Sequence, residues 1–257
     1  MDQGTYIAAS NGILQFAKLD VVNNNLANIN TTGFKRQFIV SRDQSFDDTL
    51  ASQLVSPLDD PYAKGDQERA PGVVEIGTYT DFSQGAIKET GNPFDVALTN
   101  PNDFFVIETP EGPQYTRAGN FTLNEEGTLV TSDGYPVQGD GGALIVNGSK
   151  ASIGAGGTLI VDGVNVGNLQ VVRFSDPSVL EQQGGCRFKV RDGQDGGAET
   201  VEADLVPGAV ETSNVSAVTA MIELISTNRG FQMYERTART IDEMNNIAVQ
   251  QIGRKIA

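Results

Sequence analysis

The chain lacks several residue types on which common enzyme active sites depend. Its 257 residues include no histidine and no tryptophan, and cysteine occurs once, as Cys186. Without histidine, Ser-His-Asp and Cys-His catalytic groups and histidine-ligated metal sites are excluded. A single cysteine cannot form a disulfide within the chain. No base stands near Cys186 in the sequence, so we interpret it as a structural residue.

The sequence also lacks a long apolar run and an excess of basic residues. No run of about 18 apolar residues is present, so we expect no membrane span. The start, Met1-Asp2-Gln3-Gly4, lacks the basic and apolar regions of a cleaved signal peptide. Lysine and arginine number 18 against 33 acidic residues, and phosphate binding needs clustered bases, so we expect no nucleic acid partner.

The acidic residues are unevenly spread along the chain. The net charge is −15, yet residues 1–36 carry +1 and residues 211–257 carry 0, so residues 37–210 hold −16. Strongly acidic middles repel one another, whereas nearly neutral ends can pack together. This distribution is typical of a protein that assembles through its termini.

The glycine-rich loops do not match known nucleotide or calcium sites. The run Gly154-Ala155-Gly156-Gly157-Thr158 lacks the Lys-Ser/Thr ending of a phosphate-binding loop. The acidic run at 192–197 lacks the spacing and terminal glutamate of an EF-hand, so we interpret it as a turn. The sequence therefore gives no positive case for an enzyme, and we predict no catalytic residue, cofactor or metal ion.

Residues 5–29 predict a helix, because apolar residues recur there every three or four positions. The end of this helix carries Asn23, Asn24, Asn25 and Asn28, although the asparagine amide competes with the backbone for hydrogen bonds. A solvated face usually carries better helix formers such as Glu, Lys and Gln. We therefore interpret the asparagines as a polar recognition strip, with simple exposure to water as the alternative. Gly33 is expected to end the helix with a positive φ.

The middle of the chain predicts β structure. Residues 37–71 have linker composition, with a short strand at 38–40 and an extended hairpin as the alternative. Residues 72–210 hold 23 of the 29 glycines, and their short apolar runs separated by turn signals are typical of an all-β sandwich or barrel-like domain. The predicted strands are 104–109, 115–117, 120–123, 128–131, 143–146, 158–161 and 169–174, and the turn glycines are 112, 127, 134, 141, 142 and 163.

Residues 211–257 predict a second helix, with an apolar stripe from Val218 to Ile252 and Ser213 or Asn214 as its N-cap. A helix this long needs a partner, and the N-terminal helix is the only other one predicted. The predicted fold class is α+β, with N- and C-terminal helices in a coiled-coil pair and an all-β, sandwich or barrel-like domain inserted between them. The predicted domains are an N-terminal assembly helix (1–36), a linker or hairpin (37–71), an outer β domain (72–210) and a C-terminal assembly helix (211–257).

Three motif blocks resemble the bacterial flagellar rod and hook proteins. The first is Asn24-Asn25-Leu26-Ala27-Asn28, followed by Asn30-Thr31-Thr32-Gly33-Phe34-Lys35. The last is Val210-Glu211-Thr212-Ser213-Asn214-Val215, followed by Met221-Ile222 and Arg229-Gly230-Phe231. The middle block contains Phe94-Asp95-Val96-Ala97-Leu98, Phe104-Phe105-Val106, Tyr115-Thr116-Arg117-Ala118-Gly119-Asn120-Phe121 and Gly134-Tyr135-Pro136-Val137. The resemblance covers nearly the whole chain, and residues 139–143 and 229–233 are more similar to the proximal-rod subfamily than to the distal-rod subfamily.

The resemblance implies a structural subunit of the basal-body rod that has no enzymatic activity and no cofactor. It implies export through the flagellar export apparatus without a cleaved signal peptide, and a place in the periplasm-spanning rod. The implied partners are further copies and other axial rod and hook subunits, with no nucleic acid and no direct membrane insertion. We expect the assembly interface to include Asn24, Asn25, Leu26, Ala27, Asn28, Gly33, Phe34, Ser213, Asn214, Val215, Met221, Leu224, Arg229, Phe231 and Ile241.

Three alternatives stay open at this point. Within the family, the chain could instead be a distal-rod subunit. A secreted β module with a helical oligomerisation stalk would bind a ligand in a pocket within residues 72–210. An acidic glycan-active enzyme would need a pair of carboxylates in a cleft.

Overall fold

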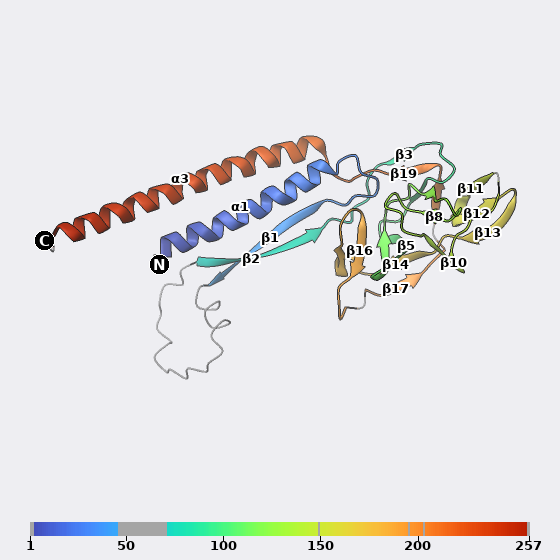
Figure 1. Cartoon of the computed structure of the whole chain (residues 1–257), viewed down its shortest axis with the longest axis horizontal. Helices are drawn as coiled ribbons and strands as arrows, with labels where there is room; N and C mark the ends of the chain where they lie inside the picture. Colours follow the sequence, from blue (N-terminus) through green and yellow to red (C-terminus); the bar gives the residue numbers. More distant parts are fainter. Residues whose placement is uncertain (1–2, 46–70, 149, 195, 203, 256–257) are drawn as a thin grey trace. The chain divides into compact units, whose positions relative to one another are not determined.

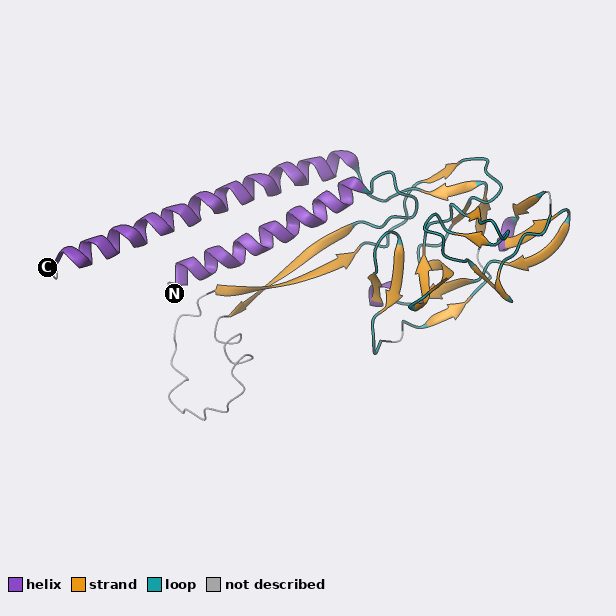
Figure 2. Ribbon diagram, in the orientation of Figure 1, coloured by secondary structure: helices purple, strands orange, loops and turns teal. Residues whose placement is uncertain are grey.

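The computed structural model describes residues 3–45, 71–148, 150–194, 196–202 and 204–255. Within this part of the chain, two long helices accompany many short strands, which confirms the α+β class (Figures 1 and 2). The chain divides into two compact units. We call Met1–Asn24, Phe38–Tyr79 and Val218–Ala257 the helical unit, and Asn25–Gln37 and Thr80–Ala217 the β unit.

The helical unit contains α1 (Gln3–Ala27) and α3 (Ala217–Lys255). Gly12 of α1 lies against the ring of Tyr234, so closely that a Cβ atom at Gly12 would overlap the ring. Gly230 of α3 similarly faces the side chain of Gln15. The two helices therefore pack antiparallel, and a glycine on each allows the close approach. Among the described residues, no helix is long and apolar enough to cross a membrane.

The predicted linker begins and ends as strands. β1 (Gln37–Ser45) and β2 (Pro71–Thr80) form a two-stranded sheet, and the rings of Phe38 and Tyr79 stack with centroids 6.1 Å apart. The predicted strand at 38–40 is therefore part of a longer element. Residues 46–70 lie outside the described part of the chain.

The β unit is built around a six-stranded antiparallel sheet in the order β15-β16-β6-β5-β14-β17. Its strands are β5 (Asp103–Thr109), β6 (Gly112–Thr116), β14 (Val171–Phe174), β15 (Leu180–Gln182), β16 (Arg187–Val190) and β17 (Ala198–Thr200). The three-stranded sheet contains β11 (Ala151–Ile153), β12 (Thr158–Val161) and β13 (Val164–Asn168). The two-stranded sheets pair β3 (Ile87–Glu89) with β19 (Ala209–Glu211), β4 (Val96–Leu98) with β18 (Leu205–Pro207), β7 (Thr122–Leu123) with β8 (Leu129–Val130), and β9 (Gln138–Gly139) with β10 (Gly142–Ala143). Short 3₁₀ turns occur at Ala155–Gly157 and Pro177–Val179.

The central strand β5 is buried on both of its sides. Phe105 and Ile107 point into one apolar cluster, and Phe104 and Val106 point into another, because successive side chains of a strand face opposite ways. The rings of Phe104 and Phe174 pack edge to face with centroids 5.6 Å apart. The run Phe104-Phe105 therefore fills two separate cores.

The conformation of the turn glycines agrees closely with the prediction, but the predicted ends of the helices are wrong. Five of the six predicted turn glycines have positive φ, as does Gly33, and Gly141 is the exception. However, α1 ends at Ala27, so Gly33 lies six residues beyond the helix and does not terminate it. Likewise α3 begins at Ala217, so neither predicted N-cap is at its start. Ser213 Oγ accepts from the Val215 amide, and Asn214 Oδ1 accepts from the Arg36 amide. Gly33 and Asn214 instead bond to backbone groups of distant residues, Glu211 and Arg36, which no local pattern identifies.

Gly33 occupies a position where the backbone of the N-terminal segment touches the backbone of the β unit. Its φ is +70°, and a Cβ atom there would overlap the Arg117–Ala118 peptide. Its amide donates to the carbonyl oxygen of Glu211 at 2.8 Å. Only glycine combines the left-handed backbone with this close contact.

We expect Gly33→Ala to lower the free energy of unfolding by more than Gly91→Ala does. Gly91 has a similar φ of +74° but open space around it, so both alanines incur the left-handed cost of about 1–2 kcal/mol. Only at Gly33 must the neighbouring backbone also move. Urea unfolding followed by circular dichroism measures both, and equal losses would contradict the packing role of Gly33.

Candidate assembly surface and its buried support

Three charged side chains from distant segments meet in the interior of the β unit, and we call Lys35, Arg117 and Glu211 the ionic cluster. Lys35 Nζ donates to Glu211 Oε1 at 2.7 Å. Arg117 Nε and Nη2 donate to Glu211 Oε2 at 2.9 and 2.5 Å. All three side chains are at most 1 % exposed, so water does not screen these ion pairs.

Backbone groups supply further hydrogen bonds to each member of the ionic cluster. Lys35 Nζ also donates to the carbonyl oxygen of Ser83 at 2.7 Å, and the amide of Gly85 donates to Glu211 Oε1 at 2.8 Å. Arg117 Nη1 donates to two backbone carbonyl oxygens in the segment 100–103. These partners matter, because a buried charge left without partners is strongly destabilising.

The environment of Lys35 disfavours its charged form. Burial lowers the pKa of the Lys35 ammonium from its usual value, and the nearby Arg117 charge adds to this effect. The Glu211 carboxylate acts in the opposite direction but does not outweigh burial. Among the groups around Lys35, Glu211 does most to favour the charged form.

Two asparagines of the motif blocks bond to backbone groups of the chain itself. Asn25 Nδ2 donates to the carbonyl oxygen of Gln37 at 2.7 Å, and Asn25 Oδ1 accepts from the Gln37 amide at 2.9 Å. Asn214 Oδ1 accepts from the Arg36 amide at 2.7 Å, and its Nδ2 donates to the carbonyl oxygen of Asp81 at 2.9 Å. A side-chain amide can match a peptide donor and acceptor together, which explains asparagine at these positions.

The residues predicted for the assembly interface fall into three groups by exposure. Asn25, Gly33, Phe34, Ser213 and Val215 are buried in this chain. Leu26, Asn28, Asn214, Leu224, Phe231 and Ile241 are half-buried. Asn24, Ala27, Met221 and Arg229 are exposed. The structure thus brings part of the predicted set together at the ionic cluster and leaves another part on the surface.

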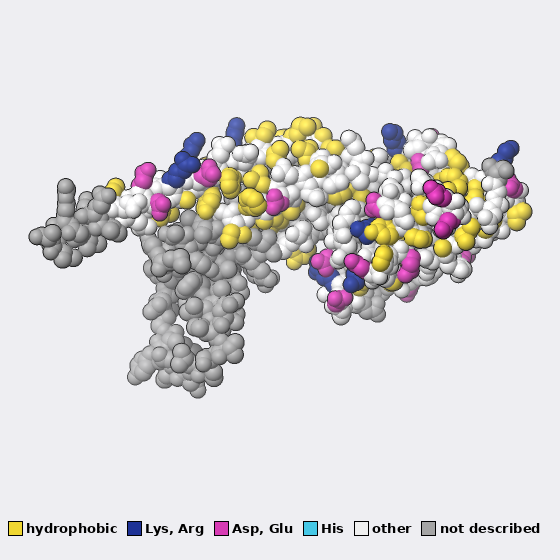
Figure 3. Space-filling model, in the orientation of Figure 1, with side chains coloured by type: hydrophobic (Ala, Val, Ile, Leu, Met, Phe, Trp, Pro, Cys, Tyr) yellow, Lys and Arg dark blue, Asp and Glu magenta, His cyan; other side chains and the backbone are white. Residues whose placement is uncertain are grey.

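α3 is apolar on two opposite faces. With 3.6 residues per turn, Ala220, Leu224, Phe231, Tyr234, Ala238 and Ile241 share the side that faces α1. The opposite side, which we call the α3 outer face, carries Val218, Met221, Ile222, Ile225, Met233, Met244 and Ile247, each 53–69 % exposed. Figure 3 shows hydrophobic atoms gathered over the first half of α3 and charged side chains towards its other end. A helix with water on its outer side would carry polar residues there, so the α3 outer face indicates a further partner.

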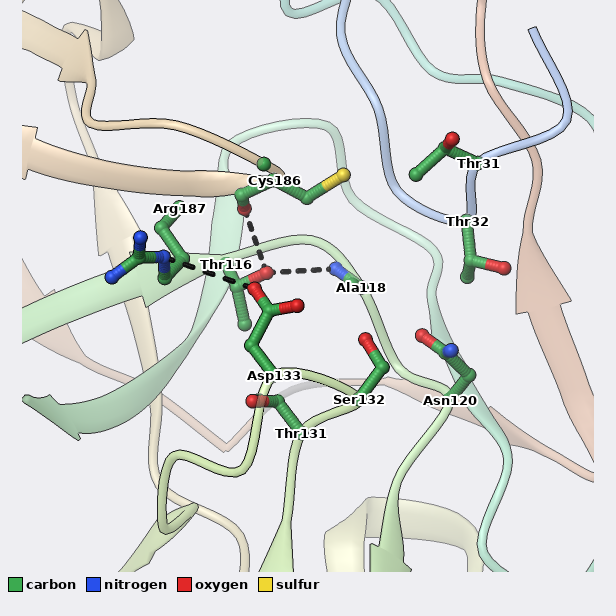
Figure 4. Close-up of a pocket in the computed structure, with 11 residues that line it drawn as sticks. Thr31, Thr32, Thr116, Ala118, Asn120, Thr131, Ser132, Asp133, Cys186 and Arg187 are labelled. Atoms are coloured by element: carbon green, nitrogen blue, oxygen red, sulfur yellow. Dashed lines mark hydrogen bonds and ion pairs between the residues drawn. The ribbon is translucent and has the colours of Figure 1, made fainter. Parts of the chain in front are cut away.

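Two hollows of the β unit differ in size and in lining. A polar pocket of about 90 Å³, drawn in Figure 4, is smaller than most small-molecule sites. It is lined by Thr31, Thr32, Thr116, Ala118, Asn120, Thr131, Ser132, Asp133, Gly185, Cys186 and Arg187. A wider hollow of about 530 Å³ lies beside Phe94, Leu123 and Ile160, with Lys150 as its one charged lining residue. Among the described residues, no group of histidine, cysteine, aspartate and glutamate is arranged to hold a metal ion.

Cys186 borders the polar pocket, but its thiol is unreactive. Burial, together with the charge of Asp133, raises the pKa of its thiol to about 12. Its carbonyl oxygen accepts from Thr116 Oγ1 at 2.8 Å, as Figure 4 shows. Because the thiolate is the reactive form, the thiol is a poor nucleophile near neutral pH.

Comparison with known proteins places the three motif blocks in one family. Residues 6–35 match the model described as "Flagella basal body rod protein", residues 100–168 the "Flagellar hook protein FlgE/F/G D1 domain", and residues 206–251 the "Flagellar basal body rod FlgEFG protein C-terminal". The flagellar basal-body rod protein FlgF of Caulobacter vibrioides is 29 % identical over 257 residues, covering 99 % of both chains. FlgG of the same organism is 32 % identical over 255 residues, covering 94 % of this chain and 96 % of its own.

The chain belongs to the flagellar basal-body rod protein family. As a rod protein it is a structural subunit of the flagellum, not an enzyme, and it serves bacterial motility. Each of the three matched regions of the rod protein contributes one member of the ionic cluster: Lys35, Arg117 and Glu211.

The ionic cluster was not predicted from the sequence, although its members lie within the quoted motifs. Lys35 follows the buried Phe34, Arg117 directly follows β6, and Glu211 ends a buried strand. A charged residue in an otherwise apolar setting signals a buried pair. The sequence does not say which charges meet, because the three positions are 82 to 176 residues apart.

We expect Glu211→Gln to lower the free energy of unfolding by about 3–5 kcal/mol, since it leaves two buried cations without their counter-charge. Glu111→Gln is the matched control, because Glu111 is exposed at the β5–β6 turn. Urea unfolding followed by circular dichroism measures both variants. A loss at Glu211 no larger than that at Glu111 would show that the ionic cluster contributes little.

The contribution of Lys35 to the free energy of unfolding should change with pH in the alkaline range. The folded chain releases the Lys35 proton at a lower pH than the unfolded chain, whose lysine has the usual pKa of 10.5. Between these two pKa values the unfolded chain binds more protons, so this group makes the free energy of unfolding rise with pH. The difference between wild type and Lys35→Met should therefore move in favour of wild type as the pH rises towards 10.5. A difference that stays flat or falls, measured by urea unfolding across that range, would contradict the lowered pKa.

Proposed function

We propose that this rod protein polymerises through α1 and α3 into the axial tube of the flagellar rod. The observation that carries the proposal is the α3 outer face, which is apolar and exposed opposite the face that packs on α1. A subunit with two different contact surfaces forms heterologous contacts, which generate an open helical tube unless the rotation closes. In this proposal α1 and α3 form a coiled-coil pair, and the β domain is sandwich or barrel-like.

Exposure assigns different roles to the predicted interface residues. Asn24, Ala27, Met221 and Arg229 are exposed and would contact a neighbouring subunit directly. The buried and half-buried members, Asn25 among them, would support that surface through contacts within their own chain. The division into an assembly helix at 1–36, a hairpin region at 37–71, an outer β domain at 72–210 and an assembly helix at 211–257 is part of the same proposal.

The proposed partners are further copies of the chain and other axial rod and hook subunits. Export through the flagellar apparatus without a cleaved signal peptide, and a place in the periplasm-spanning rod, belong to the proposal too. Its support is the match to rod proteins along three regions of the chain.

Within the rod we propose a proximal, FlgF-like position. The similarity to FlgF of Caulobacter vibrioides extends over 99 % of both chains. The FlgG similarity, with its slightly higher identity, supports the distal position as the alternative. A small tag on the subunit, located by electron microscopy along purified basal bodies, separates the two positions.

The assembly role is tested by placing a charge on the α3 outer face. We expect Ile225→Glu to abolish rod assembly and swimming, because a buried carboxylate without a partner is costly at an apolar contact. Thr219→Glu adds the same charge at an exposed position between the two faces of the helix and should leave assembly intact. Soft-agar motility and electron microscopy of basal bodies measure the outcome in cells that carry only the variant. Normal swimming with Ile225→Glu would overturn the proposal.

A further inference from the structure

The register of the two helices leaves the end of α3 without a neighbour in α1. Gly12 lies beside Tyr234, and Gln15 lies beside Gly230. In this antiparallel pair, the numbers of two facing residues therefore add up to about 245. Both helices rise about 1.5 Å per residue, so Gln3, at the start of α1, lies beside a residue near position 243, by extrapolation. Met244–Lys255 therefore continues past the described start of α1 by about 18 Å. Figure 1 shows this end of α3 extending beyond α1.

This protruding segment carries exposed apolar side chains. Met244 is 64 % and Ile247 is 55 % exposed, and both lie on the α3 outer face. We call these two residues the tail patch. A lone helical extension with such residues gains stability only when another surface covers them.

The opposite end of the same helix exposes a second apolar patch. Val218, Met221, Ile222 and Ile225 lie on the α3 outer face, and we call them the head patch. Residues 217–222 include no charged side chain. Between the two patches the same face carries Arg229, Arg236 and Glu243, with Met233 as its one large apolar residue.

This order along the α3 outer face favours a contact between ends over a contact along the whole length. Pairing two such faces along their full length would bury the charged middle against another helix, at a desolvation cost. Overlapping only the ends joins two uncharged apolar patches and leaves the charged middle in water. The two patches differ in sequence and sit at opposite ends, so a contact between them leaves one of each free and can be repeated.

We propose that the tail patch of one copy docks on the head patch of the next copy. The occupant of each patch is thus a second copy of this chain, and the contact is heterologous. The inference rests on the proposed polymerisation through the helices but goes further, because it names which ends meet. In this arrangement Met244–Lys255, the part of α3 that extends beyond α1, links consecutive subunits.

Disulfide trapping in the full chain tests this pairing. In a Cys186→Ala background, Ile222→Cys and Ile247→Cys are made as separate variants with different tags, purified, mixed and oxidised. Within one chain the two positions are 25 residues apart on one helix, about 37 Å, so no bond can form between them intramolecularly. Glu235→Cys, exposed on α3 but off the outer face, replaces Ile222→Cys in the control mixture.

We expect the mixed dimer joining positions 222 and 247 to exceed both same-position dimers and the control dimer. The expected excess is about tenfold, the ratio given by a preference of about 1.4 kcal/mol. A dominant 222–222 dimer would show a symmetric contact and overturn the proposal, and so would equal yields of all pairs. If Ile225→Glu abolishes rod assembly while the mixed dimer does not form, the helices still drive polymerisation and only the head-to-tail pairing fails.

Discussion

The buried carboxylate of Glu211 is the interaction on which the rest of the β unit depends. It neutralises Lys35 from the N-terminal segment and Arg117 from the β domain, while standing itself in the C-terminal segment. In water these charges would attract one another weakly, but in the interior any missing partner is costly. The arrangement is therefore stable only when all three segments are present together, and it specifies one way of joining them.

The motifs that identify the family thus have a role within the single chain. Gly33 and Glu211 bond through their backbones, and Asn25 matches both peptide groups of Gln37. Asn214 accepts from the Arg36 amide and donates to the carbonyl oxygen of Asp81. These contacts leave few of the motif side chains free for a neighbouring subunit. Residues that fold the chain and residues that assemble it are largely different, and exposure separates them better than position in a motif.

In the helices, the residues that pack within the chain and those that are exposed lie on different faces of α3. Gly12 and Gly230 permit close packing of α1 on α3, whereas the α3 outer face carries more exposed apolar surface than an isolated subunit needs. Apolar ends and a charged middle on that face suit a polymer in which subunits overlap at their ends. The near-neutral charge of the terminal segments removes the repulsion that the acidic middle would otherwise impose.

The sequence by itself determined the local features of this protein. Periodicity predicted both helices, the strand at 158–161 was predicted with its observed bounds, and five of the six turn glycines have the predicted positive φ. Each of these features depends on neighbouring residues alone. The motif blocks also sufficed for the family and its structural role. Tertiary structure alone decided that Lys35, Arg117 and Glu211 meet, that Asn25 turns inward, and which apolar face of α3 packs on α1 and which stays exposed. These outcomes depend on which distant side chains share one desolvated space, and no local pattern in the chain encodes that.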